Sequence, residues 1–137
     1  MVRPPLTEQN LKRELAYFRE KFPSLHDDEL FVVWFLRAFV TEDEETAAKS
    51  LTGVGGDKGL DAILIDDAAK IVFVVQGKYR QKFNQKNEVR SDVLGFANLA
   101  YQLCDSEAFA SLTQDMDPLA RKKATEAYDR CNKEDID

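Results

Sequence analysis

The sequence predicts an α/β domain in which a small mixed sheet around one β-hairpin is flanked by helices. Three observations predict it. The segments 61–66 and 70–78, DAILID and KIVFVVQGK, are rich in branched residues and are separated by a short turn at 67–70. Apolar residues recur at intervals of three and four on both sides of this pair, as they do in helices. The chain of 137 residues is long enough for one domain with a single core.

Two helices are expected before the hairpin. The first begins after Thr7, whose side chain can cap it, and ends before Pro23. Its apolar residues form one stripe: Leu11, Leu15, Phe18 and Phe22. The second is expected after Ser24, because Asp27 three residues later resembles a capping box. It carries LFVVWFL at 30–36, which is apolar nearly all round, so we expect this helix to lie inside the domain.

The remaining elements follow from similar patterns. Thr41 and Glu44 repeat the capping spacing and predict a short third helix to about Leu51. Four glycines between residues 53 and 59 then predict a loop that leads into the first strand. Helical periodicity after the hairpin predicts three further helices, over about 88–104, 107–112 and 117–132.

The composition argues against several classes of protein. No apolar run approaches the ~20 residues of a membrane span, and the N-terminus has neither an apolar signal core nor an arginine-rich import pattern. We therefore expect a cytoplasmic protein with no membrane contact. Cys104 and Cys131 have no histidine at metal-ligand spacing, which predicts reduced thiols and no zinc site.

Charge is distributed unevenly along the chain. The net charge of -6 argues against nucleic-acid binding by bulk charge alone. The segment 70–90, however, holds six basic residues against one acid, Glu88. Basic side chains neutralise phosphates and aromatic rings stack on bases. The nucleic-acid-binding candidates are Arg80, Lys82 and Lys86, interleaved with Tyr79 and Phe83. A solvated basic loop is the alternative interpretation.

Three polar residues are expected at the open end of the hairpin. Burying an amide or a lysine beside a strand core costs free energy unless the group has a partner or a task. Side chains alternate between the two faces of a strand, so Gln76 and Lys78 share one face. With a four-residue turn at 67–70, Asp61 lies opposite Gln76 and points the same way. The register therefore predicts that Asp61, Gln76 and Lys78 meet in one patch. A turn one residue longer without a bulge would turn Asp61 to the other face.

A carboxylate, an amide oxygen and an ammonium group in one patch suit metal-dependent phosphodiester hydrolysis. Mg²⁺ prefers hard oxygen ligands and keeps several waters, so Asp61 and Gln76 are the candidate ligands. Lys78 is the candidate to orient the attacking water or to neutralise charge in the transition state. Taken one at a time, each residue also has a structural interpretation, as a strand-end acid, a strand-edge amide and a surface lysine.

The same residues resemble a known family. GGDKGLDAILID followed by VVQGK is similar to the core of the PD-(D/E)xK nuclease superfamily, in the version with glutamine in place of the second acid, as in Mrr-like restriction endonucleases. GDKGLDAI and VVQGKYR, after a helix of the type DDELFVVWFLRAFV, are similar to the N-terminal nuclease-like domain of abortive-infection phage-resistance (AIPR) proteins. The resemblance covers about 24–103. An aspartate followed by QxK is a weak pattern alone, and the glycine-rich lead-in, the hairpin spacing and the flanking helices make it more specific.

The resemblance implies a restriction-endonuclease-like fold and an endonuclease that depends on Mg²⁺ or Mn²⁺. Its substrate would be DNA, with RNA as the alternative, and its role antiviral defence against phage in a prokaryote. Position by position, Asp61 matches the metal-binding aspartate, Gln76 the residue in place of the second acid, and Lys78 the motif lysine. Symmetric double-strand cutters of this kind are often dimers, so a homodimer is expected by analogy.

An acid on the first core helix often completes the metal site of this superfamily. Glu29 is the best match, with Glu44 and Glu45 as rivals. The alternative for Glu29 is an acid at a helix start that interacts favourably with the helix dipole. His26 is expected near the same helix start as an exposed residue or a cap contact, and Asp57 as a loop-shaping residue.

The sequence departs from the family after the last matched helix. Members continue into another core strand, whereas the chain after Leu103 offers only helical or polar segments. Residues 1–137 are thus expected to be one nuclease-like domain, either trimmed or an N-terminal fragment of a longer protein. The departure keeps two other functions open: a catalytically inactive nuclease-fold module that binds nucleic acid or a protein partner, and a purely structural domain.

Overall fold

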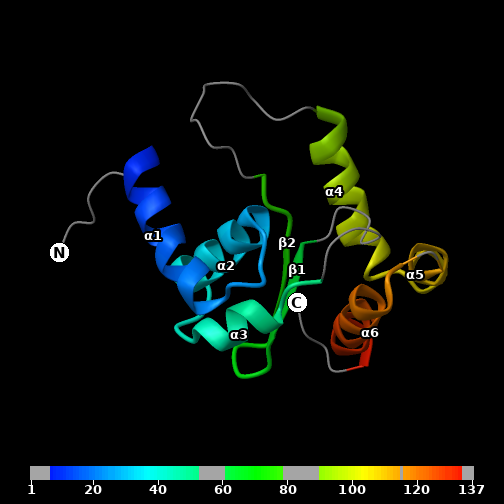
Figure 1. Ribbon diagram of the computed structural model, residues 1–137. Coiled ribbons are helices and arrows are strands. Elements are labelled where there is room, and N and C mark those ends of the chain that lie inside the picture. The colour runs from blue at the N-terminus through cyan, green and yellow to red at the C-terminus, as the bar shows by residue number, and fades with distance from the viewer. Residues whose placement is uncertain (1–6, 53–60, 79–89, 115, 134–137) are drawn as a thin grey trace.

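The computed structural model describes residues 7–52, 61–78, 90–114 and 116–133. Within these ranges the chain is mixed α/β, with six helices and one sheet of two antiparallel strands (Figure 1). The helices are α1 (Glu8–Lys21), α2 (Asp27–Phe39), α3 (Glu44–Lys49), α4 (Arg90–Gln102), α5 (Ser106–Thr113) and α6 (Pro118–Lys133). The strands are β1 (Ala62–Asp66) and β2 (Ile71–Val75). The predicted α/β class is confirmed, and the mixed sheet with further strands stays a prediction.

The hairpin forms a middle layer between two groups of helices. In Figure 1, α1, α2 and α3 lie on one side of β1 and β2, and α4, α5 and α6 lie on the other. Ala62 and Leu64 belong to the core with α1–α3, whereas Ile63 belongs to a second core with α4–α6. The expectation of a single core was therefore wrong. Because successive side chains point to opposite faces and both faces are apolar, the hairpin needs a helical layer on each side.

Helix α2 lies inside the domain, as its all-round apolar pattern predicts. Leu30, Val33 and Leu36 are fully buried against α1, α3 and the hairpin. Two of its rings still reach the surface, because Phe35 is 38% exposed and Phe39 is 65% exposed. Although α2 is the most apolar helix, no helix of the described segments has the length and hydropathy to cross a membrane.

Local capping chemistry explains where the first and third helices begin. Thr7 caps α1 as predicted, since its Oγ1 accepts a hydrogen bond from Asn10 N at 3.1 Å. The expectation that Thr41 caps the third helix was wrong, because Asp43 is the cap and its Oδ1 accepts from Glu45 N at 3.3 Å. Thr41 instead holds the turn before the helix, where its Oγ1 accepts from Asp43 N at 3.2 Å.

The capping box of α2 lies two residues later than the sequence suggests. His26 is the N-cap, and its backbone N–H donates to Glu29 Oε1 at 3.0 Å. The expected pair of Ser24 and Asp27 was therefore wrong. Both pairs have the spacing of a capping box, but Asp27 is already the first helical residue.

The register of the hairpin follows from its turn. Asp66 pairs with Ile71 across the four turn residues 67–70, and the ladder continues to Ala62 opposite Val75. This confirms the predicted register over the whole length of both strands. Asp66 stabilises the turn, because its Oδ1 accepts from Ala69 N at 3.0 Å. Lys70 closes the turn in the left-handed region, with φ of 58°.

Candidate functional site

Asp61 comes directly before β1 and is bound to the end of β2 at two points. Its backbone N–H donates to Val75 O at 2.9 Å, and its carboxylate Oδ2 accepts from Gly77 N at 2.7 Å. Ala62 is already the ladder partner of Val75, so two consecutive residues oppose one, as in a β-bulge. Counting residues outward from the turn predicts that Asp61 pairs directly with Gln76. In the structure the ladder ends at Ala62 and Val75, and Asp61 also bonds to Val75. The half-buried carboxylate of Asp61 instead reaches the backbone between Gln76 and Lys78.

Gln76 and Lys78 share a cavity of about 310 Å³, which we call the β2 cavity. Its described lining comprises the rings of Phe31, Phe35 and Phe96, aliphatic side chains of α2 and β2, and Gln76, Gly77 and Lys78. Gln76 is half-buried and Lys78 is exposed. Gln76, Gly77 and Lys78 thus line one cavity at the end of β2, whereas Asp61, which binds Gly77 N, is not among its lining residues.

The start of α2 lies beside the same end of β2 (Figure 1). Val32 Cγ2 would be 2.8 Å from a Cβ built on Gly77, so the helix and the strand end are in close contact. Glu29 lies one turn before Val32 on the same side of α2. The carboxylate of Glu29 accepts a hydrogen bond from the backbone N–H of His26 in the capping box. Glu29 therefore has the structural role of an acid at a helix start, where the helix dipole favours it.

The two rival acids lie elsewhere, in the first turn of α3. Glu44 accepts hydrogen bonds from Tyr17 Oη at 3.0 Å and from Lys21 Nζ, both on α1. The hydrogen bond from Lys21 lowers the pKa of Glu44, and the same bond raises the pKa of Lys21. Glu44 therefore holds α3 to α1. Glu45 is exposed on the same short helix. Of the three candidate acids, Glu29 is the one on α2, the helix that contacts Gly77 through Val32.

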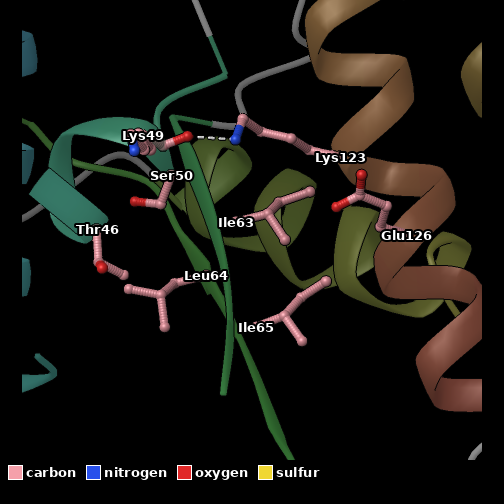
Figure 2. Close-up of a pocket in the computed structure, with 8 residues that line it drawn as sticks. All are labelled: Thr46, Lys49, Ser50, Ile63, Leu64, Ile65, Lys123 and Glu126. Atoms are coloured by element: carbon pink, nitrogen blue, oxygen red, sulfur yellow. Dashed lines mark hydrogen bonds between the residues drawn. The ribbon is translucent and has the colours of Figure 1, made fainter. Parts of the chain in front are cut away.

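A second cavity, of about 230 Å³, lies along the outer edge of β1 between α3 and α6 (Figure 2). Ile63 and Ile65 point toward α6, whereas Leu64 points toward α3. Lys123 of α6 donates from Nζ to the carbonyl oxygen of Lys49, the last residue of α3. Burial lowers the pKa of Lys123, because it disfavours the charged form. This cavity is a junction between helices, and none of the predicted site residues that the structure describes lines it.

The β1 edge is also completed by backbone bonds. Leu51, which was expected at the end of the third helix, instead forms an antiparallel bridge with Ala62. Thr52 N donates to Asp61 O at 3.0 Å, and Ile63 N donates to Ser50 O at 2.9 Å. The backbone of Asp61 is therefore bonded to both of its neighbours in the sheet, and its carboxylate is held by Gly77 N.

Several predicted contributors lie outside the described residues. The described chain resumes at Asp61 and stops at Lys78, so the flanking segments 53–60 and 79–89 are not characterised. They contain Asp57, the glycine-rich loop and the nucleic-acid-binding candidates, Arg80, Lys82 and Lys86, with Tyr79 and Phe83. In the part that is characterised, no group of three or more His, Cys, Asp or Glu side chains forms a metal-binding cluster.

Sequence reasoning missed the aromatic walls of the β2 cavity. The sequence pattern places Phe31 and Phe35 on a buried helix and Phe96 within the helix predicted over about 88–104. The spacing of four between Phe31 and Phe35 placed them on one helix face, which was the available signal. That this face meets α4 at the end of β2 follows only from the packing of three separate elements.

Fold and site together define a mixed α/β chain with polar side chains at the open end of a hairpin that is covered on both faces. Comparison with family models, with curated proteins and with solved structures gave no match to this chain. The family resemblance is therefore carried by the motif residues alone.

Proposed function

We propose that this chain is a metal-dependent nuclease with a restriction-endonuclease-like fold, which hydrolyses phosphodiester bonds of DNA in prokaryotic defence against phage. One observation carries the proposal. Asp61 reaches across the hairpin end to Gly77 N at 2.7 Å, and so its carboxylate lies at the backbone between Gln76 and Lys78. The proposal requires the Gln76 amide and the Lys78 ammonium group to act with this carboxylate at the end of the hairpin, where backbone bonds hold Asp61.

The proposed cofactor is a hydrated Mg²⁺ or Mn²⁺ ion, because carboxylate and amide oxygens are the kind of ligand that these ions prefer. Asp61 and Gln76 would hold the ion, and Glu29 at the start of α2 would assist. Mg²⁺ is commonly held by one or two carboxylates and keeps several waters, so a set with few protein ligands is suitable. When bound, the ion would polarise the phosphoryl oxygen and lower the pKa of a bound water.

Lys78 supplies the positive charge of the site. Lys78 is exposed and lines the β2 cavity. Phosphodiester hydrolysis builds negative charge on the phosphoryl oxygens, and an ammonium group placed there stabilises the transition state. The basic residues that follow in the sequence, Arg80, Lys82 and Lys86, would extend this charge along the nucleic-acid backbone.

The test is cleavage of plasmid and single-stranded substrates with Mg²⁺ or Mn²⁺. Asp61→Asn and Lys78→Ala are expected to lower the cleavage rate about 100-fold or more. The matched control is Asp66→Asn at the other end of β1, because Asp66 also accepts a backbone N–H, at 3.0 Å, but lies at the turn. The control should cleave at the wild-type rate. Equal rates for wild type and Lys78→Ala would remove the role assigned to the lysine.

The hydrogen bonds of Asp61 and Glu29 favour a second candidate function, that of a non-catalytic binding module. Asp61 Oδ2 and Glu29 Oε1 each accept a backbone N–H, which are structural tasks that a non-catalytic domain would also need. The alternative is an inactive nuclease-fold module that binds nucleic acid or a protein partner. Salt-dependent DNA binding without metal-dependent cleavage would support it over the nuclease.

A further inference from the structure

The β2 cavity has walls suited to a flat aromatic ligand. Phe35 of α2 and Phe96 of α4 approach it from the two opposite helical layers of the domain. Phe35 is 38% exposed, so a ligand can reach its ring without unfolding the core. With a volume of about 310 Å³, the cavity is at the small end of the range for ligand sites, which suits one ring system better than a larger molecule.

The charges at the cavity suit an anionic ligand. Although the chain has a net charge of -6, the described lining of the β2 cavity has one cation, Lys78, and no acid. Acids line two other cavities, each together with basic residues. The cavity between α1 and α2 is lined by Glu14, Glu44 and Arg37. The cavity at the β1 edge is lined by Glu126, Lys49 and Lys123. An apolar aromatic wall with a cation in the same lining complements a nucleotide, whose base is flat and whose phosphate is anionic.

We propose that the β2 cavity binds an unpaired base of single-stranded DNA while Lys78 contacts the adjoining phosphate. This inference rests on the proposed nuclease function and specifies its substrate: a strand with unpaired bases. The base stacks on Phe35, and its phosphate lies at Lys78. A base paired within a duplex cannot enter, because its faces are covered by the neighbouring bases.

The test measures binding with a chelator present, so that cleavage cannot occur. Three labelled probes of the same length are titrated: a single-stranded oligonucleotide, its duplex, and a single strand with abasic sites. The full-length wild type should bind the base-containing single strand most tightly. Phe35→Ala should weaken that binding about 5- to 150-fold, from the loss of one base-stacking ring. Phe35→Trp should restore it, because tryptophan also stacks on bases.

Phe39→Ala is the matched control. Phe39 is on the same helix, its ring centroid is 5.2 Å from that of Phe35, and it does not line the β2 cavity. Its removal should change the affinity by about twofold or less. Equal losses in Phe35→Ala and Phe39→Ala, or equal affinity of wild type for the base-containing and abasic strands, would overturn the proposal. Binding of an apolar peptide in place of the single strand would do the same.

The inference and the proposed function fail in different ways. Metal-dependent cleavage that depends on Lys78, together with binding that does not depend on Phe35, would leave the nuclease and remove the base pocket. Phe35-dependent binding of single strands without any cleavage would leave the pocket and favour the inactive module.

Discussion

The two edges of the hairpin are completed in different ways. At the β1 edge, Leu51 bridges Ala62, and Lys123 links α6 to the end of α3. At the end of β2, residues of α2, α4 and the strand line an apolar cavity. The hydrogen bond from Gly77 N to Asp61 is the polar contact there. The β1 edge therefore holds the fold by paired backbone groups, whereas the β2 end leaves space beside a lysine and an amide. We expect stability to depend mainly on the first region and ligand binding on the second.

The largest expected difference in stability between the two strands comes from truncating an isoleucine in each of them. Ile63 of β1 is 3% exposed and Ile71 of β2 is 37% exposed. Ile63→Ala should lower the free energy of unfolding by about 2–5 kcal/mol, because it leaves a cavity in a packed core. Ile71→Ala should cost about 1 kcal/mol or less, because its side chain is already partly in water. Urea unfolding measures both, and a similar loss in the two variants would contradict the proposed asymmetry.

A smaller effect is expected where α2 meets the end of β2. Gly77→Ala would place a Cβ 2.8 Å from Val32 Cγ2, and Val32 is buried and stiff at χ1. Overpacking of this kind should lower the unfolding free energy by about 1–3 kcal/mol. It should also displace Gly77 N from Asp61, and so weaken cleavage.

Gly95→Ala in α4 is the control for this substitution. A Cβ on Gly95 meets nothing within 4 Å, so the change should stabilise the helix by about 0.5–1 kcal/mol. Thermal unfolding compares the two variants. Destabilisation by Gly95→Ala as large as that by Gly77→Ala would show that the contact with Val32 is not the cause.

The smallest effect is expected at the junction that closes the β1 edge. Lys123→Met keeps the apolar stem but loses the hydrogen bond to Lys49 O, so it should cost about 1 kcal/mol. Lys122→Met, an exposed neighbour on α6, is the control and should leave unfolding nearly unchanged. DNA cleavage should be the same in both variants, since neither residue lies at the β2 end.

The pH dependence of Lys123 provides a second measurement. Burial lowers its pKa in the folded state below the ordinary value of 10.5, so the unfolded chain binds more protons between the two values. The unfolding free energy of the wild type should therefore rise relative to that of Lys123→Met as the pH increases toward 10.5. Below the pKa of Lys123 in the folded state, the difference between the two unfolding free energies should be constant. A difference that falls with increasing pH would contradict the assigned cause.

The sequence by itself determined the hairpin and the register of its two strands. Two-residue alternation and a four-residue turn fix the register from Asp66–Ile71 to Ala62–Val75, because both signals are local. The order of helices and strands also followed from local periodicity. Helix starts did not follow from capping preference alone. His26 is the N-cap of α2 although Ser24 is a preferred capping type, and Asp43 caps α3 in place of Thr41.

Tertiary structure alone decided the bulge at Asp61, the contact of Val32 with Gly77, and the cavity that Phe35 and Phe96 line. Each depends on how elements that are far apart in the sequence pack against one another, and no local sequence pattern encodes that packing. The second core has the same origin, because a strand apolar on both faces does not say which helices will cover each face.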